Sequence, residues 1–116
     1  MVENVILVKS KAFAIRAVKL YQWMMERKKE ATLAKQLLRS GTSIGANVRE
    51  AHHAQSKREF IAKMNIALKE AAETEYWLEL LHETGYLSEK EYASIAADCA
   101  ELNKLLIAII KTSNGK

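Results

Sequence analysis

Apolar residues recur along this chain at steps of three and four positions, the spacing that gathers them on one face of an α-helix. Four such stretches are separated by short polar segments and predict helices at about 4–26, 32–54, 57–84 and 89–112. Connections of only a few residues make consecutive helices lie side by side in opposite directions. The pattern therefore predicts one all-α domain over residues 1–116, an antiparallel up-down-up-down four-helix bundle.

Cap signals mark the ends of the third and fourth predicted helices. Ser56 with Glu59, and Ser88 with Glu91, have the S-x-x-E spacing of a capping box. Gly85 follows the third apolar stretch and is placed to end that helix in the left-handed conformation that glycine adopts without strain. No linker or internal repeat separates the predicted helices into further domains.

The centre of the second predicted helix, residues 40–46, is rich in small residues and contains Gly41 and Gly45. Glycine inside a helix costs about 1 kcal/mol relative to alanine, and a local interpretation of this stretch would be a loop. The apolar phase matches on both sides of the glycines, however, and this favours a continuous helix. We predict that the small residues let the third helix approach closely, with the glycines packed near Ala67 and Ala71.

Composition favours a folded helical domain and excludes several other classes of protein. Hydrophobic residues make up 49% and charged residues 28% of the 116 positions, which excludes disorder, and proline is absent. The apolar runs are far shorter than the ~20 residues that a membrane span needs, and the first residues do not resemble a signal peptide. Cys99 is the only cysteine and cannot form an internal disulfide, which suits a reducing compartment. We therefore expect a cytoplasmic protein without membrane contact.

Residues that could carry catalysis or bind a metal do not form a recognisable site in this sequence. There is no glycine-rich phosphate loop, paired-cysteine motif or nucleophile elbow. His52 and His53 are adjacent, so on a helix they diverge by about 100° and cannot chelate one ion. Cys99 falls on the apolar stripe of the fourth helix, where a small core residue needs no further role. We predict no catalytic residue, no metal and no cofactor, and hence a protein that is not an enzyme.

The charge distribution is strongly uneven, although the net charge is only +4. Residues 1–69 contain fourteen Lys and Arg against five Asp and Glu, whereas residues 70–116 contain four against nine. Such a chain has a positive surface that attracts an anion, or two surfaces that attract each other. Six basic residues form rows on the first two helices and are candidate phosphate contacts without base specificity: Lys9, Arg16, Lys19, Lys35, Arg39 and Arg49. The alternative is a solvated face, and the rows lack the interleaved aromatic residues of single-strand binders.

A second set of polar residues is predicted to make contacts between helices or between subunits. Its members are Ser43, Asn47, Glu70, Glu73 and Trp77. The two glutamates share a helical face with the tryptophan instead of lying opposite the core, and their expected partners lie on the second helix. Arg39 and Arg49 belong to that helix, so they could serve in these contacts instead of binding phosphate. The pattern leaves both interpretations open.

Three parts of the chain resemble one bacterial family: Gln36–Ala51 with its two glycines, Ser56–Lys63, and Lys69–Leu78 followed by Gly85–Leu87. The family consists of four-helix-bundle proteins first noticed as reading frames inside intervening sequences of 23S ribosomal RNA genes. The resemblance implies an up-down-up-down bundle, a continuous second helix and assembly into a homopentameric ring. One branch is the accessory variability determinant of diversity-generating retroelements, in which a basic pentamer binds a reverse transcriptase and nucleic acid. For most of the family the function is unknown.

Charge and resemblance together lead to two functional hypotheses. The first is a non-enzymatic, homo-oligomeric binding module that contacts RNA or DNA phosphates through its first two helices. The alternative is a structural scaffold or accessory protein that docks a protein partner without binding nucleic acid. The uneven charge also predicts a head-to-tail contact in which opposite charges meet repeatedly; such a contact closes as a ring, which we predict, or continues as a filament.

Overall fold

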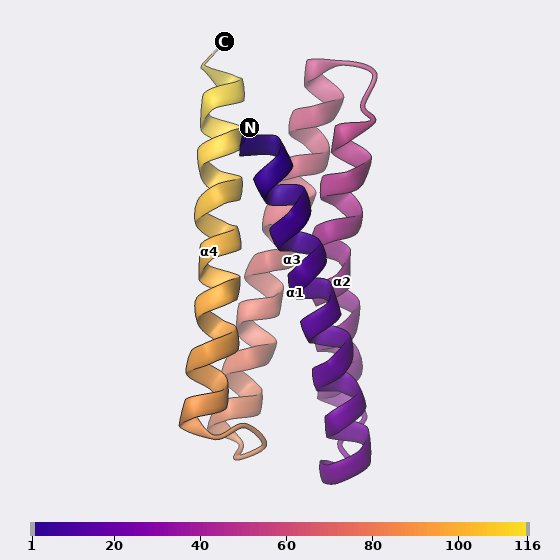
Figure 1. Cartoon of the computed structure of the whole chain (residues 1–116), viewed down its shortest axis with the longest axis vertical. Coiled ribbons are helices and arrows are strands. Elements are labelled where there is room, and N and C mark those ends of the chain that lie inside the picture. The colour runs from indigo at the N-terminus through magenta and orange to yellow at the C-terminus, as the bar shows by residue number, and fades with distance from the viewer. Residues whose placement is uncertain (1, 116) are drawn as a thin grey trace.

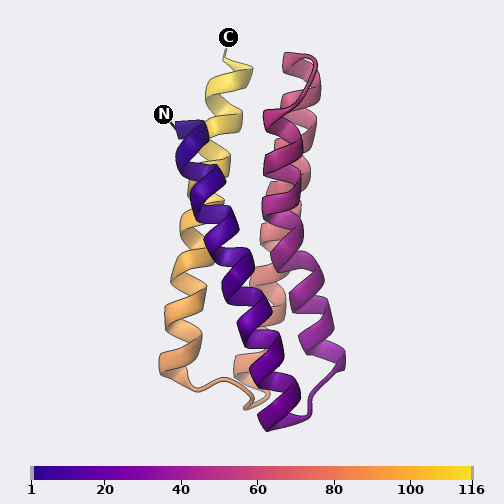
Figure 2. The same cartoon turned by 45° about the vertical axis from the view of Figure 1, so that its right-hand side comes forward.

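The computed structural model describes residues 2–115, and four α-helices account for most of them (Figure 1). They are α1 (Val2–Trp23), α2 (Thr32–His52), α3 (Lys57–Glu83) and α4 (Glu89–Asn114). No residue in the described range lies in a β-strand. The chain runs down along α1, up along α2, down along α3 and up along α4 (Figures 1 and 2). The prediction of an all-α fold with four helices is confirmed, and the molecule measures 46 × 21 × 19 Å.

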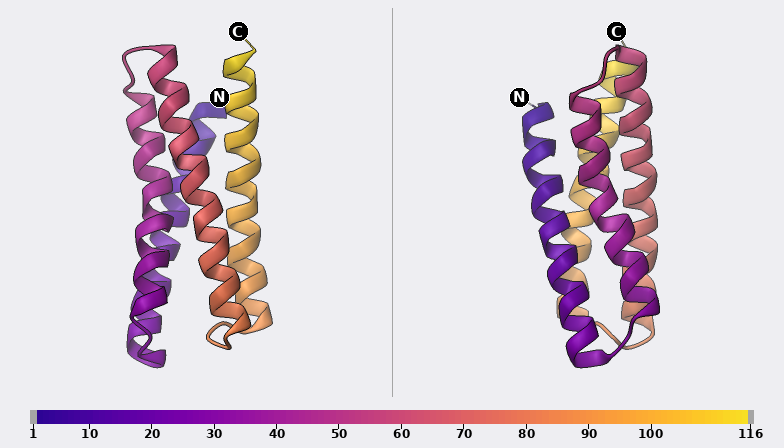
Figure 3. Two further views of the ribbon diagram at one scale, coloured as in Figure 1. Left: turned by 180° about the vertical axis from the view of Figure 1, so that it is seen from behind. Right: turned by 90° about the vertical axis from the view of Figure 1, so that its right-hand side faces the viewer.

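The four helices are not equally close to one another. α2 packs mainly against α1 and α3, and α4 packs mainly against α3, as the views from behind and from the side show (Figure 3). α1 has less contact with α4, and two grooves open between these helices. The face between α1 and α4 is therefore the loosest side of the bundle.

The core is built from the apolar positions that the three-and-four spacing places on one side of each helix. Large residues such as Leu37, Ile44, Met64, Leu78 and Leu106 are fully buried. Fully buried alanines lie among them and allow the helix backbones to approach closely; they are Ala17, Ala34, Ala67 and Ala71. Burial of this apolar surface stabilises the fold by roughly 25 cal/mol per Å².

Gly41 and Gly45 lie inside α2, so the predicted continuous helix is confirmed. The prediction that they pack against α3 is wrong, because both glycines face α1. A Cβ atom placed on Gly41 would lie 2.9 Å from the Cβ of Ala17, and one on Gly45 would lie 3.2 Å from the carbonyl oxygen of Ser10. The absence of a side chain at these two positions thus sets the distance between α1 and α2.

The side of α2 that faces α3 carries a buried polar contact instead. Ser40 and Thr74 are both fully buried, and their hydroxyl oxygens are hydrogen-bonded at 2.9 Å. Thr74 Oγ1 also lies 2.8 Å from the carbonyl oxygen of Glu70, one helical turn earlier. A buried hydroxyl without a partner is costly, so this pair favours one register of α2 on α3.

The two predicted capping boxes differ in the structure. At the start of α4, Ser88 Oγ accepts from the Glu91 N–H at 3.1 Å, and the Glu91 carboxylate accepts from the Ser88 N–H at 2.8 Å. At the start of α3, Ser56 Oγ accepts from the Glu59 N–H. The Glu59 carboxylate, however, accepts from the N–H of Gln55 instead of Ser56. The box at α3 is therefore only half formed, although the cap itself is present.

Two residues in the left-handed conformation end helical segments. Gly85 has a φ of 88° and follows α3, as predicted, and the Tyr86 N–H donates back to the Leu81 carbonyl at 2.8 Å. α1 extends past its predicted end through a π-helical turn, Met24–Lys28, in which Met24 is buried. This turn ends at Lys29, which has a φ of 56°.

Candidate nucleic-acid interface

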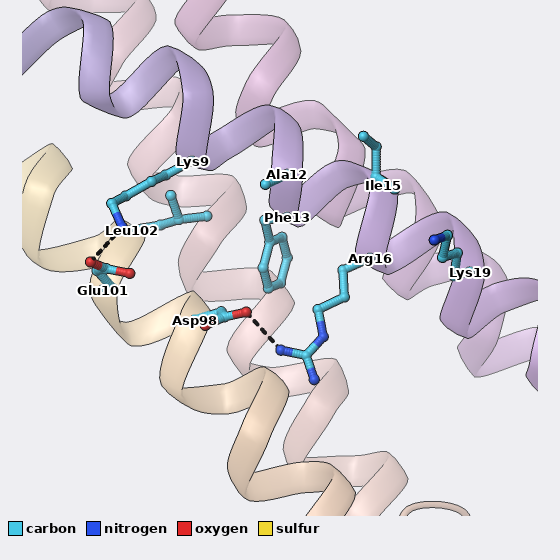
Figure 4. Close-up of a pocket in the computed structure, with 9 residues that line it drawn as sticks. All are labelled: Lys9, Ala12, Phe13, Ile15, Arg16, Lys19, Asp98, Glu101 and Leu102. Carbon is cyan, nitrogen blue, oxygen red and sulfur yellow. Dashed lines mark hydrogen bonds and ion pairs between the residues drawn. The ribbon is translucent and has the colours of Figure 1, made fainter.

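Two of the predicted phosphate contacts, Lys9 and Arg16, point from α1 toward α4 across a groove of about 370 Å³ (Figure 4). Lys9 Nζ lies 3.0 Å from a carboxylate oxygen of Glu101, and Arg16 Nη1 lies 2.6 Å from one of Asp98. Arg16 also donates to the Ser94 hydroxyl at 2.7 Å. Ion pairs as exposed as these contribute about 1 kcal/mol at most. A phosphate would therefore have to displace a carboxylate from Lys9 or Arg16, but each of these ion pairs is weak.

Four other basic residues of α1 and α2 are exposed and have no acidic side chain within 4 Å in the part of the chain that the structure describes. We call them the open cations: Lys11, Lys19, Lys35 and Arg49. In Figure 4, Lys19 lies apart from both ion pairs of the α1–α4 groove. Lys11 and Arg49 border a separate groove of about 230 Å³ between α1 and α2, beside Gly45.

Lys11 was missed by the sequence analysis. It does not continue the row formed by Lys9 and Arg16, which step along the side of α1 that faces α4. Lys11 lies instead on the outer side of α1, three positions after Val8 and four before Ile15, which are also exposed. Its position relative to these two exposed residues is the signal that could have identified it.

Arg39, the remaining predicted phosphate contact, is paired with acidic residues of α3. Its guanidinium forms an ion pair with Glu73 and lies 3.6 Å from a carboxylate oxygen of Glu70. The Trp77 indole N–H donates to the same Glu73 oxygen at 3.0 Å. This hydrogen bond is the main reason that the pKa of Glu73 lies below its usual value, and Arg39 lowers that pKa further. The cluster fastens α2 to α3 at the bundle surface.

Ser43 and Asn47 do not reach this cluster. The Ser43 hydroxyl donates to the Arg39 carbonyl at 2.7 Å, and the Asn47 amide donates to the Ser43 carbonyl at 2.9 Å, so both bond along their own helix. One carboxylate oxygen of Glu70 is buried and has no hydrogen-bond partner within residues 2–115; it is the oxygen that lies 3.6 Å from the Arg39 guanidinium. Of the predicted α2 partners, only Arg39 contacts the two glutamates.

The hydrogen bond from Trp77 predicts a pH-dependent effect on stability. A carboxyl whose pKa is lowered by folding contributes stability above its unfolded pKa and loses that contribution as the pH falls. Replacing Trp77 with Phe removes the largest cause of the lowered pKa of Glu73. We expect Trp77→Phe to lower the free energy of unfolding near pH 7, and the difference from wild type to shrink below about pH 4.

Urea unfolding at several pH values measures this difference. Tyr76→Phe is the control, because Tyr76 is an exposed neighbouring aromatic residue that makes no hydrogen bond to Glu73. A Trp77→Phe deficit that is the same at pH 7 and at about pH 3.5 would show that lost packing, not the carboxylate, causes the effect.

Comparison with known proteins shows the family. The sequence profile of one family, described as 23S rRNA-intervening sequence protein, matches residues 3–108. This chain belongs to that family. A solved structure from Bacteroides thetaiotaomicron, described as a protein with unknown function from the S23 ribosomal protein family, is 58% identical to it. The match covers 96% of this chain and 99% of that chain, with a TM-score of 0.95. No curated protein matches the chain.

This intervening-sequence protein also has an apolar outer surface on α1. Val8 is 70% exposed and Ile15 is 49% exposed, and Val5 and Val18 are exposed on the same helix. We call this surface the α1 outer face, and the open cation Lys11 lies on the same side of the helix as Val8 and Ile15. Exposed apolar residues grouped in this way mark surfaces that contact another macromolecule.

The potential metal ligands of the described residues do not cluster, and the cysteine lies in the core. Residues 2–115 contain no group of three or more His, Cys, Asp and Glu side chains that could hold a metal ion. Cys99 is buried in the core, and burial raises the pKa of its thiol to about 12, so it is not a nucleophile at neutral pH. None of the described helices combines the length and apolar character needed to cross a bilayer.

Proposed function

We propose that this intervening-sequence protein is a cytoplasmic, non-enzymatic, homo-oligomeric module whose helices α1 and α2 contact the phosphates of RNA or DNA. The observation that carries the proposal is the set of four open cations, which are exposed and have no acidic partner among the residues that the structure describes. Lys and Arg contacts to phosphate do not depend on base sequence. Lys9 and Arg16 add to the surface when a phosphate displaces their exposed carboxylate partners, whereas Arg39 serves the contact between α2 and α3.

Assembly strengthens such a surface. In a homopentameric ring, each subunit presents the same cations, and one nucleic-acid strand contacts several subunits in turn. Weak single contacts then combine through avidity without any new interaction. Each neutralised phosphate also releases condensed counterions, so binding weakens steeply as salt increases.

Replacing three open cations tests the proposal. We expect Lys19→Gln, Lys35→Gln and Arg49→Gln together to lower the affinity for labelled oligonucleotides by about tenfold or more near 50 mM salt, because each lost phosphate contact removes counterion release. The dependence of affinity on salt should become less steep for the same reason. Fluorescence anisotropy between about 50 and 200 mM salt measures both quantities.

The matched control removes three exposed lysines from α4 instead: Lys90, Lys104 and Lys111. This variant has the same net charge as the first, so it should retain more of the wild-type affinity. Equal losses in the two variants would mean that net charge alone governs binding. No binding by wild type at about 50 mM salt and about 100 µM protein would refute the proposal.

A protein-docking scaffold is the second candidate function, and the α1 outer face favours it. Val8 and Ile15 are too exposed to stabilise the isolated bundle, yet they lie on one side of one helix. A second copy of the chain or another protein would remove this apolar surface from water. Assembly through this face is compatible with nucleic-acid binding, whereas a scaffold alone would leave the open cations in solvent.

The assembly has its own test. We expect wild type to have a mass of five chains by light scattering, and Val8→Glu with Ile15→Glu to shift it toward the single chain, because two buried charges would oppose the contact. Ile107→Glu is the control, because Ile107 is 52% exposed but lies on α4. A wild-type monomer at high micromolar concentration would refute assembly, and a dimer would refute the ring.

A further inference from the structure

A groove of about 300 Å³ lies between the C-terminal part of α1 and the N-terminal part of α4. Its apolar lining includes Trp23 and Leu20 of α1 and the buried residues Leu87 and Ile95. Arg16 and Lys19 line this groove and also the larger groove of Figure 4, so the two are continuous along α1. A half-buried tryptophan therefore lies next to two basic residues.

An aromatic residue does lie beside the basic rows, contrary to expectation. Trp23 follows Lys19 by four positions, one helical turn. A third cation, Lys28 from the π-helical turn, lies over the Trp23 ring with its Nζ 5.4 Å from the centroid. An aromatic ring in a groove that cations also line is the combination that binds bases and phosphates of single strands.

The acidic residue of the groove sets the direction in which such a ligand would lie. Glu91 belongs to the lining, and one of its carboxylate oxygens is held by the Ser88 N–H at 2.8 Å. Its negative charge repels a phosphate, whereas Arg16 and Lys19 attract one. A nucleotide would therefore place its phosphate toward the two basic residues and its base against Trp23.

We infer that the Trp23 groove is a stacking site for an unpaired nucleobase of a single-stranded nucleic acid. The inference rests on the proposed function and narrows it to strands whose bases are free. A base in a duplex is stacked and paired, so it cannot enter a groove on a protein surface without leaving the helix. Single strands should therefore bind more tightly than duplexes of equal length.

The experiment compares an intact single strand with an abasic strand of the same length, which has the same phosphates but no bases. Trp77→Phe is the background for all measurements, because Trp23 is then the only tryptophan. We expect the intact strand to bind at least about fivefold more tightly than the abasic strand, the low end of base stacking on an aromatic residue. We also expect the intact strand alone to quench Trp23 fluorescence.

Substitution of the ring separates stacking from general packing. Trp23→Leu should bind intact and abasic strands equally. Its affinity for the abasic strand should equal that of the Trp77→Phe background. Trp23→Phe should recover part of the preference for the intact strand. These affinities are measured by anisotropy of the labelled strands, since the variants lack tryptophan fluorescence in this background.

The possible failures are distinguishable. Equal affinity for intact and abasic strands, with no quenching, would overturn the stacking site and leave phosphate binding intact. No binding of either strand would overturn the proposed function and the stacking site together. A preference for the intact strand that survives in Trp23→Leu would place the stacking residue elsewhere and would also overturn the inference.

Discussion

Gly41→Leu should destabilise the protein by about 3 kcal/mol, the upper part of the range for overpacked cores. A Cβ at Gly41 would already lie 2.9 Å from the Cβ of Ala17, which has no rotatable bond with which to move away. The rest of a leucine side chain would then push α1 and α2 apart. The gain of about 1 kcal/mol in helix propensity on replacing glycine does not offset this clash. Urea unfolding at one fixed protein concentration measures the loss, since the proposed assembly would make stability depend on concentration.

A glycine swap identifies the partner helix. Gly41→Ala should be destabilising alone, and Ala17→Gly should restore stability in the double variant, because the Cβ atom moves from one helix to the other and the propensity terms cancel. Ala67→Gly is the control, since Ala67 lies on α3 and should not rescue Gly41→Ala. Rescue by Ala67→Gly instead of Ala17→Gly would show that Gly41 packs against α3 and not against α1.

Thr74→Val should lower the free energy of unfolding by about 1–3 kcal/mol, the cost of leaving a buried hydroxyl without its partner. Threonine and valine side chains have nearly the same shape, so the substitution removes the hydrogen bond without opening a cavity. Ser40 is fully buried, and its only other hydrogen bond, to the Leu37 carbonyl, is long at 3.5 Å. The Ser40 hydroxyl would therefore lose its better partner and could not reach water.

A double-mutant cycle separates this effect from lost packing. Ser40→Ala combined with Thr74→Val should be less destabilising than the sum of the single changes, because neither hydroxyl is then left buried alone. Thr74→Ser keeps the hydroxyl and should cost only about 0.8 kcal/mol for the lost methyl group. Thr74→Val with wild-type stability in urea would show that the contact contributes nothing to the fold.

The helices of this protein could be predicted because their signals are local. Apolar residues at steps of three and four identified all four segments, and Gly85 ended α3 with the expected positive φ. The apolar phase across Gly41 and Gly45 was sufficient to predict a continuous α2. The π-helical turn after Trp23 was not predicted, because a buried Met24 at the end of α1 looks the same in an α-helix.

The candidate site was only partly predictable. The uneven charge located the basic residues on α1 and α2, but it did not show which of them have acidic partners. Lys9 and Arg16 are paired with residues more than eighty positions away, whereas Lys19 and Arg49 have no such partner in the described chain. Such pairs depend on where α4 lies beside α1, and no local pattern contains that information.

By itself, the sequence determined which residues of each helix face inward, because a helix turns by a constant angle per residue and burial follows that period. Only the tertiary structure decided which helix each inward residue meets. Gly41 faces Ala17 of α1 instead of α3, and its neighbour Ser40 faces Thr74 of α3. Adjacent positions on α2 thus contact different helices, since one residue turns the helix by about 100° and the choice of partner depends on packing around the whole bundle.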